Sequence, residues 1–135
     1  MTDMELLSLA HRARSLSYCP YSGFAVGAAL LDSTGKVWTG CNIENASYGP
    51  TNCAERTAFF KAVSEGVRSF DRIAIAGGPA DAVPVAGTSP CGVCRQVMAE
   101  FCGPDFVILL EGENGQPVSY TLEQLFPMGF GPGNL

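Results

Sequence analysis

The chain has 135 residues, about the length of one domain, and we expect a single domain over residues 1–135. Hydrophobic residues make up 47% of it and charged residues 16%, which gives enough apolar side chain for a buried core and excludes a disordered protein. Its formal net charge of −5 supplies no basic surface for phosphate backbones, so we expect a small neutral ligand and no nucleic-acid polymer.

The first nine residues include Asp3 and Glu5 and lack the basic start, apolar stretch and cleavage site of a secretory signal. No apolar run is long enough to span a bilayer. We therefore expect a cytoplasmic protein that does not bind membranes. In that compartment, six cysteines indicate metal or thiol chemistry in preference to disulfides.

Hydrophobic periodicity and turn residues predict helices that alternate with strands. Residues 3–17 have helical spacing, with Thr2 or Asp3 as the cap, and include the only histidine, His11, which we expect at the surface. The predicted strands are Ala25–Leu31, Val37–Ile43, Arg72–Ala76, Phe106–Leu110 and Pro117–Tyr120. The other predicted helices run from a cap at Thr51 or Asn52 to about Glu65, over Cys91–Phe101, and over Leu122–Phe126. An initial hairpin followed by alternating elements predicts an α/β fold with a mixed sheet.

Two motifs carry the strongest chemical signal: Asn52-Cys53-Ala54-Glu55-Arg56 and Pro90-Cys91-Gly92-Val93-Cys94. Three protein ligands with an open fourth position are typical of catalytic zinc, whereas structural zinc is closed by four ligands. Both motifs fall at predicted helix starts, where partial positive charge favours the thiolate form that binds zinc. Cys91 and Cys94 are one helical turn apart, so their sulfurs can face one ion.

The remaining site features depend on geometry at the helix start. At a helix start, the side chain of Glu55 can point toward the open metal position. A purely structural zinc site would not need this carboxylate. Three thiolates around Zn²⁺ leave a formal charge of −1, and Arg56 or Arg95 can offset it.

Two other readings of the C-x-x-C motif stay open, a redox pair and half of a zinc knuckle. A redox pair would follow a strand, but a proline-containing loop precedes this motif. A knuckle needs a fourth ligand, and Cys19, Cys41, Cys102 and His11 have no motif spacing to the site. The three additional cysteines are expected to be small buried side chains.

At these residues the chain resembles the cytidine deaminases of the small, homotetrameric, zinc-dependent family. The resemblance covers nearly the whole chain, and its main segments are Tyr21–Leu30, Gly40–Tyr48, Cys53–Thr57, Ser89–Val97 and Leu125–Pro132. It implies a three-layer α/β fold with a mixed five-stranded sheet between helices. One departure is the loop before Cys91, Val83 to Thr88, which is longer than the family pattern.

The resemblance also implies an activity, the hydrolytic deamination of cytidine and 2′-deoxycytidine in pyrimidine salvage, and a role for each site residue. Cys53, Cys91 and Cys94 would hold Zn²⁺, and Glu55 would be the catalytic proton shuttle. The substrate would be bound by Phe24 on the base, by Asn42 and Glu44 on the ribose, and by Ala46, Tyr48 and Phe130 reaching a neighbouring subunit of a homotetramer with shared active sites.

The spacing of Asn42 and Glu44 supports their role independently, because alternate residues of a strand face the same side. Two alternatives remain. One is an enzyme like blasticidin S deaminase, which shares the cysteine signature. The other is a zinc-stabilised interaction module without catalysis, for which Glu55 would be dispensable.

Overall fold

The computed structural model describes all 135 residues. Its strands are β1 (Phe24–Asp32), β2 (Val37–Cys41), β3 (Phe70–Pro79), β4 (Val107–Glu111) and β5 (Pro117–Thr121). Its helices are α1 (Asp3–Arg14), α2 (Ala54–Ser64), α3 (Gly92–Phe101) and the single turn α4 (Leu122–Leu125), and a 3-10 turn, η1 (Pro132–Asn134), follows them. None of these helices has the length and apolar character needed to cross a bilayer.

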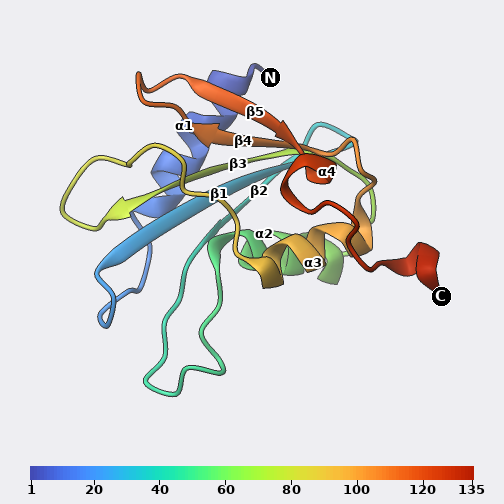
Figure 1. The fold of residues 1–135 in the computed structure, drawn as a ribbon. Coiled ribbons are helices and arrows are strands. Elements are labelled where there is room, and N and C mark those ends of the chain that lie inside the picture. Colours follow the sequence, from blue (N-terminus) through green and yellow to red (C-terminus); the bar gives the residue numbers. More distant parts are fainter.

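All five strands belong to one sheet, in the order β2-β1-β3-β4-β5 (Figure 1). Strands β3 and β4 are parallel, and every other neighbouring pair is antiparallel. The parallel pair is joined through a long loop and α3, which is the kind of crossover that parallel strands require. The mixed α/β sheet predicted from the sequence is therefore confirmed.

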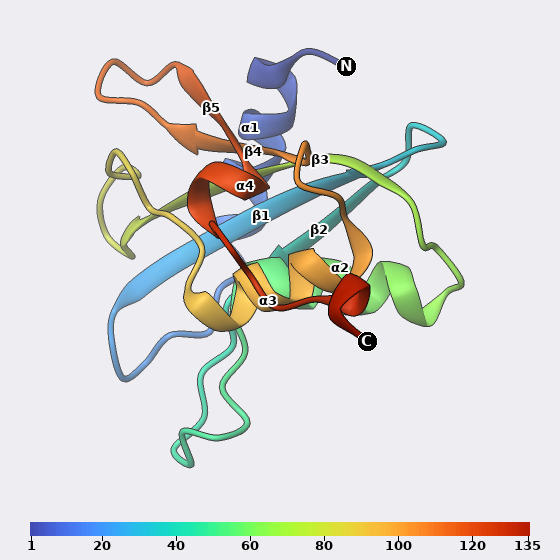
Figure 2. The same ribbon diagram turned by 45° about the vertical axis from the view of Figure 1, so that its right-hand side comes forward.

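Helix α1 covers one face of the sheet, and helices α2 and α3 cover the other (Figures 1 and 2). Buried strand residues alternate between the two faces: Ala28 and Leu30 of β1 belong to the core beneath α2 and α3, whereas Ala29 and Leu31 belong to the core beneath α1. This alternation explains why the strands read as continuous apolar runs. It also confirms the three-layer arrangement.

Helix α2 lies unusually close to β2. A Cβ atom at Gly40 would be only 2.3 Å from the carbonyl oxygen of Ala54, so a side chain at this position would push the helix away. The close contact fixes the first turn of α2 beside the end of β2. The first turn of α3 reaches the same end of the sheet (Figure 1).

Several predicted boundaries were wrong, and the strand predicted over Arg72–Ala76 runs from Phe70 to Pro79. The strand Val37–Ile43 ends at Cys41, because the chain leaves β1 after Asn42: the Ile43 amide donates to the Asn52 carbonyl at 3.0 Å. The helix predicted over residues 3–17 ends at Arg14, after which the Ser17 hydroxyl donates to the Val26 carbonyl at 3.1 Å and draws the chain toward β1.

Candidate metal and catalytic site

Two helix starts bring three cysteine sulfurs together. Cys53 is the N-cap of α2, Cys91 is the N-cap of α3, and Cys94 lies in the first turn of α3. The Sγ atoms of Cys53 and Cys91 are 3.6 Å apart, as are those of Cys91 and Cys94, and all three lie within 4.8 Å of one another. In a tetrahedral site with Zn–S bonds of about 2.3 Å, the sulfurs are separated by roughly 3.8 Å. The three sulfurs therefore fit one zinc ion.

The capping arrangement leaves these sulfurs available. Neither the Cys53 nor the Cys91 sulfur accepts a capping hydrogen bond from a main-chain N–H of its helix. The predicted cap at Thr51 or Asn52 was wrong, because both side chains are used elsewhere. The Thr51 hydroxyl accepts from the Asn45 amide at 3.0 Å, and the Asn52 amide group donates to Thr57 at 3.2 Å.

Hydrogen bonds at the helix start favour the thiolate form of Cys53. They lower its pKa from 9.0 to about 5, and the largest cause is the hydrogen bond with the Cys94 thiol. Burial of the sulfur opposes this shift, and the hydrogen bond from Arg56 adds to it. The same shared hydrogen bond, together with burial, raises the pKa of Cys94, so the pair retains one proton that a metal would displace. Nη2 of Arg56 lies 3.2 Å from Sγ of Cys53.

Arg95, the other predicted partner of the sulfurs, points elsewhere. Its Nε donates to the Pro90 carbonyl at 2.7 Å, and its Nη atoms contact the Leu125 carbonyl and, at 3.3 Å, the Ser89 hydroxyl. Of the two arginines, only Arg56 is placed to offset the charge of the thiolates. Arg95 instead joins the start of α3 to the C-terminal segment.

Glu55 is the second residue of α2, and it lines a pocket beside Cys53 and Cys91. The residue is only 4% exposed, and burial raises the pKa of its carboxyl from 4.5 to about 7. A cation bound at the sulfurs would favour the charged carboxylate. Glu55 therefore has the location and the acid–base range that proton transfer to and from a bound ligand requires.

The pocket has a volume of about 380 Å³, within the range of small-molecule sites. Of the substrate-binding residues predicted from the sequence, it brings together Phe24, Asn42 and Glu44 with Glu55. Sequence reasoning missed Ser22, Val26, Thr88 and Ser89, which also line it. Ser22 and Val26 could have been found, because they belong to the same motif as Phe24.

Asn42 and Glu44 reach the pocket by a route other than the predicted one. Both lie beyond the end of β2, so strand alternation does not place them. The Asn42 amide group accepts from the Val26 N–H and donates to the Phe24 carbonyl, each at 2.8 Å, and so continues the pairing with β1 through a side chain. The unused N–H of that amide remains available to a ligand.

The carboxylate of Glu44 is held by the turn before β1. Its Oε1 accepts from the amides of Tyr21 and Ser22 at 3.0 and 3.1 Å, and the Ser22 hydroxyl donates to Oε2. The hydroxyl of Ser22 is the main cause of the lowered pKa of Glu44. A carboxylate that stays charged and fixed in direction is a suitable acceptor for sugar hydroxyl groups.

Ala46, Tyr48 and Phe130 are not brought into the pocket of their own chain. Tyr48 is 83% exposed and lines a neighbouring hollow of about 310 Å³ that shares Glu44 with the pocket, and Ala46 lies exposed in the same loop. Phe130 is 59% exposed, and its carbonyl accepts from the Gln96 side chain at 2.7 Å.

The comparison with protein families decides what kind of site this is. Residues 1–110 match the family model described as "Cytidine and deoxycytidylate deaminase zinc-binding region". The chain belongs to the cytidine deaminase family. This membership confirms the resemblance inferred from the sequence. It also identifies zinc as the metal of the family's conserved region, which the three-sulfur cluster fits.

Individual relatives agree over almost the whole chain. A cytidine deaminase of Sporosarcina psychrophila is 48% identical over 134 residues, which cover 98% of this chain and 95% of the relative. The crystal structure of cytidine deaminase from Burkholderia pseudomallei superimposes with a TM-score of 0.86 at 44% identity, covering 96% of this chain and all of that one. A blasticidin-S deaminase of Bacillus cereus is less similar, at 34% identity over 131 residues that cover 95% of this chain and 91% of the relative.

Proposed function

We propose that the protein, as one domain over residues 1–135, is a cytoplasmic zinc-dependent enzyme of pyrimidine salvage. It hydrolyses cytidine and 2′-deoxycytidine to uridine and 2′-deoxyuridine with release of ammonia. One observation carries the proposal: the buried carboxylate of Glu55 lines the same pocket as Cys53 and Cys91, at the point where three sulfurs can hold one ion. A zinc site with a purely structural role would have no need of that carboxylate.

The chain's own residues divide the work of the reaction. When bound by Cys53, Cys91 and Cys94, zinc supplies the Lewis acidity that makes water a nucleophile near neutral pH. Glu55 accepts one proton from the attacking water and delivers it to ring N3, while the water oxygen forms a bond to C4. It then accepts the remaining proton of that oxygen and delivers it to the amino group, whose bond to C4 breaks, so that water and cytidine become uridine and ammonia. One carboxylate performs both transfers because it can accept and donate in turn.

The remaining residues bind and orient the substrate. Phe24 packs against the pyrimidine ring, and Asn42 and Glu44 hold the ribose hydroxyls from their fixed positions at the start of β1. Arg56 donates to the Cys53 sulfur and offsets the excess negative charge of three thiolates.

The active sites are completed by neighbouring chains in a homotetramer. Two observations support this proposal. Tyr48 and Phe130 are exposed, and the loop with Ala46 and Tyr48 lies next to the pocket of its own chain without entering it. The partners we propose are thus nucleosides and further copies of the chain, with no nucleic-acid polymer and no membrane.

The test is an absorbance screen of the purified protein against cytidine, 2′-deoxycytidine, cytidine monophosphate, adenosine and blasticidin S, with zinc quantified in the same sample. We expect turnover of the two nucleosides and about one zinc per chain. Preference for blasticidin S would instead favour an enzyme like blasticidin S deaminase. Zinc without turnover of any compound would favour an interaction module.

A further inference from the structure

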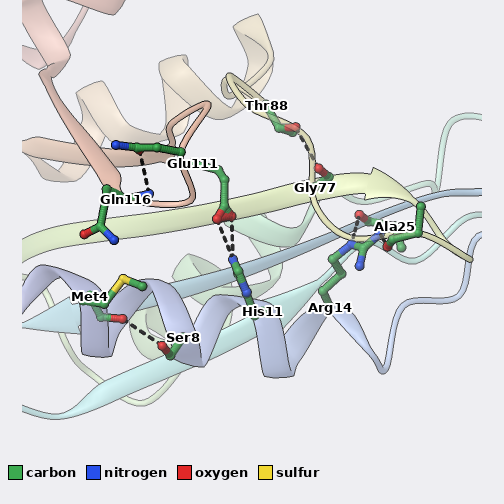
Figure 3. A network of polar contacts seen from close by, with 11 residues as sticks. Met4, Ser8, His11, Arg14, Ala25, Gly77, Thr88, Glu111 and Gln116 are labelled. Atoms are coloured by element: carbon green, nitrogen blue, oxygen red, sulfur yellow. Dashed lines mark hydrogen bonds and ion pairs between the residues drawn. The ribbon is translucent and has the colours of Figure 1, made fainter.

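Arg14 occupies an unusual environment at the end of α1. Its Nε donates to the Ala25 carbonyl at 3.0 Å (Figure 3). Its Nη2 lies 3.1, 2.5 and 2.9 Å from the carbonyl oxygens of Gly78, Pro79 and Ala82. Nη2 has two hydrogens for three acceptors, so one N–H is shared. No carboxylate pairs with this guanidinium. Its neighbours are main-chain dipoles from two segments more than fifty residues apart.

Both of these segments lead into the proposed substrate pocket. Ala25 lies between Phe24 and Val26, which line the pocket. Gly78 and Pro79 end β3 and begin the loop that arrives at Thr88 and Ser89, which also line the pocket, and then at Cys91. The guanidinium thus connects the two segments that supply these parts of the pocket wall.

The far end of the loop is fastened to the same part of the sheet. The Thr88 hydroxyl donates to the Gly77 carbonyl at 3.1 Å (Figure 3). The Val85 amide donates to the same carbonyl at 2.8 Å. A Cβ atom at Gly77 would lie 2.6 Å from Cγ2 of Thr88, so the loop returns directly over a strand residue that has no side chain. The loop before Cys91 is therefore folded back on β3.

A second contact from α1 reaches this loop indirectly. The Glu111 carboxylate, which is buried, lies 2.6 Å from Nε2 of His11 (Figure 3). The Glu111 carbonyl accepts from the amide of Gly87 at 3.0 Å. The side chain of His11 is 38% exposed, which agrees with the partly exposed surface position expected from the sequence, and its ring also contacts Glu111. Helix α1 thus supports the loop at its start through Arg14 and near its end through Glu111.

We propose that Arg14 is a positioning residue for the active site: its guanidinium holds the 79–90 loop against the start of β1 and so sets the Thr88–Ser89 wall of the substrate pocket. The planar fork of arginine can donate to both segments at once, which a lysine ammonium cannot do with the same geometry. The helix that carries it covers the face of the sheet opposite to the zinc-binding helices. The activity measurements that test this inference rest on the proposed function.

The wall contacts a ligand in the ground state and in the transition state alike, whereas Glu55 and the three sulfurs lie on α2 and α3. Loss of the guanidinium should therefore weaken substrate binding more than it slows chemistry. A general loss of folding would have the opposite signature, because it removes active molecules and leaves the KM of the remainder unchanged.

The test compares Arg14→Gln and Arg14→Lys with the matched control Arg12→Gln, in the zinc-loaded full-length protein. Arg12 lies on the same helix, is exposed and makes no side-chain hydrogen bond. For Arg14→Gln we expect KM for cytidine to rise about fivefold, the factor that one net hydrogen bond represents, with kcat per bound zinc little changed. Arg14→Lys should fall between this variant and the wild type, and Arg12→Gln should match the wild type.

Hydrogen exchange followed by mass spectrometry provides a readout that needs no substrate. In Arg14→Gln, amides of residues 80–88 should exchange faster while α2 and β4 keep their protection. Unchanged exchange in this loop would overturn the proposal, as would a fall in kcat per zinc at constant KM. If Arg14→Gln does not fold, the same two measurements on Arg14→Lys decide. Inactivity of the wild type would instead count against the proposed function. The hydrogen-exchange result would still show whether Arg14 holds the 79–90 loop in place.

Discussion

Arg56 is the side chain to which we assign a role at the metal site without making it a ligand. Its Nη2 approaches the Cys53 sulfur at 3.2 Å, and its Nε is buried without a hydrogen-bond partner. A buried donor without a partner costs stability, so the rest of the guanidinium must offset that cost. We attribute that role to the charge of the site, since three thiolates outweigh one divalent cation.

The charge role of Arg56 predicts the effect of replacing it. Arg56→Gln keeps a donor group but removes the positive charge, so the zinc becomes a poorer Lewis acid. We expect kcat to fall about tenfold, equivalent to roughly 1.4 kcal/mol of transition-state stabilisation. Arg56→Lys should lose less. Steady-state rates per bound zinc provide the measurement, with Arg12→Gln as the control, and an unchanged kcat in Arg56→Gln would remove this role.

Glu55 gives a sharper prediction at the same scale. Glu55→Gln preserves the size of the side chain but cannot carry a proton, so kcat should fall by a factor on the order of 10²–10⁴ while zinc content and fold persist. Parallel rate and zinc measurements test this, with Glu65→Gln as the control, because Glu65 is exposed at the other end of α2. Full activity of Glu55→Gln would favour the interaction module.

Among the elements, the turn between β1 and β2 depends on a buried carboxylate. Oδ1 of Asp32 accepts from the Thr34 amide and hydroxyl at 2.8 and 2.6 Å and from the Lys36 amide at 3.1 Å. Its Oδ2 accepts from Nε1 of Trp38 at 3.0 Å. These bonds, the Thr34 hydroxyl first and then Trp38, lower the pKa of Asp32 from 3.8 to about 2. The hairpin that carries Asn42 and Glu44 is stabilised by them.

Asp32→Asn tests this support. The new amide N–H₂ would face the Trp38 N–H, donor against donor, and we expect a loss of about 1–3 kcal/mol in the free energy of unfolding. The folded-state pKa is depressed, so the contribution of Asp32 is complete above pH 3.8 and is lost as the pH falls toward about 2. Urea titrations across pH should therefore show the variant and the wild type converging in acid. Asp105→Asn, at an exposed carboxylate without side-chain hydrogen bonds, is the control, and equal stability at pH 7 would contradict the argument.

The elements also show what could be predicted from sequence. Local patterns predict the two helices that begin beside Cys53 and Cys91, although not the cap of α2, and they predict the alternation of helices and strands. The exit of the chain from β2 after Cys41 depends on Ile43 pairing with Asn52, a contact that periodicity does not reveal. Thr88 and Ser89 enter the pocket only because their loop folds back over Gly77, so neither spacing nor composition could place them.

At the scale of the whole molecule, one segment stands apart. The loop between β2 and α2 projects away from the sheet (Figures 1 and 2), and it carries Tyr48 with 83% of its surface exposed. Phe130 and Met128 are also exposed on the C-terminal segment. Large apolar side chains exposed in this way are typical of protein–protein contacts. They support the proposal that neighbouring subunits complete each other's pockets.

Shared active sites predict complementation between two inactive variants. Glu55→Gln chains retain Tyr48, and Tyr48→Ser chains retain Glu55, so a mixed tetramer contains some pockets with both native residues. We expect each pure variant to be weakly active and the co-expressed mixture to recover a substantial fraction of wild-type turnover. Light scattering should give the mass of four 14.2 kDa chains for the wild type. Val118→Ser, on the edge strand β5 far from the projecting loop, should behave as wild type (Figure 1). A fully active monomer, or a mixture no more active than the sum of its parents, would show that each chain forms its site alone.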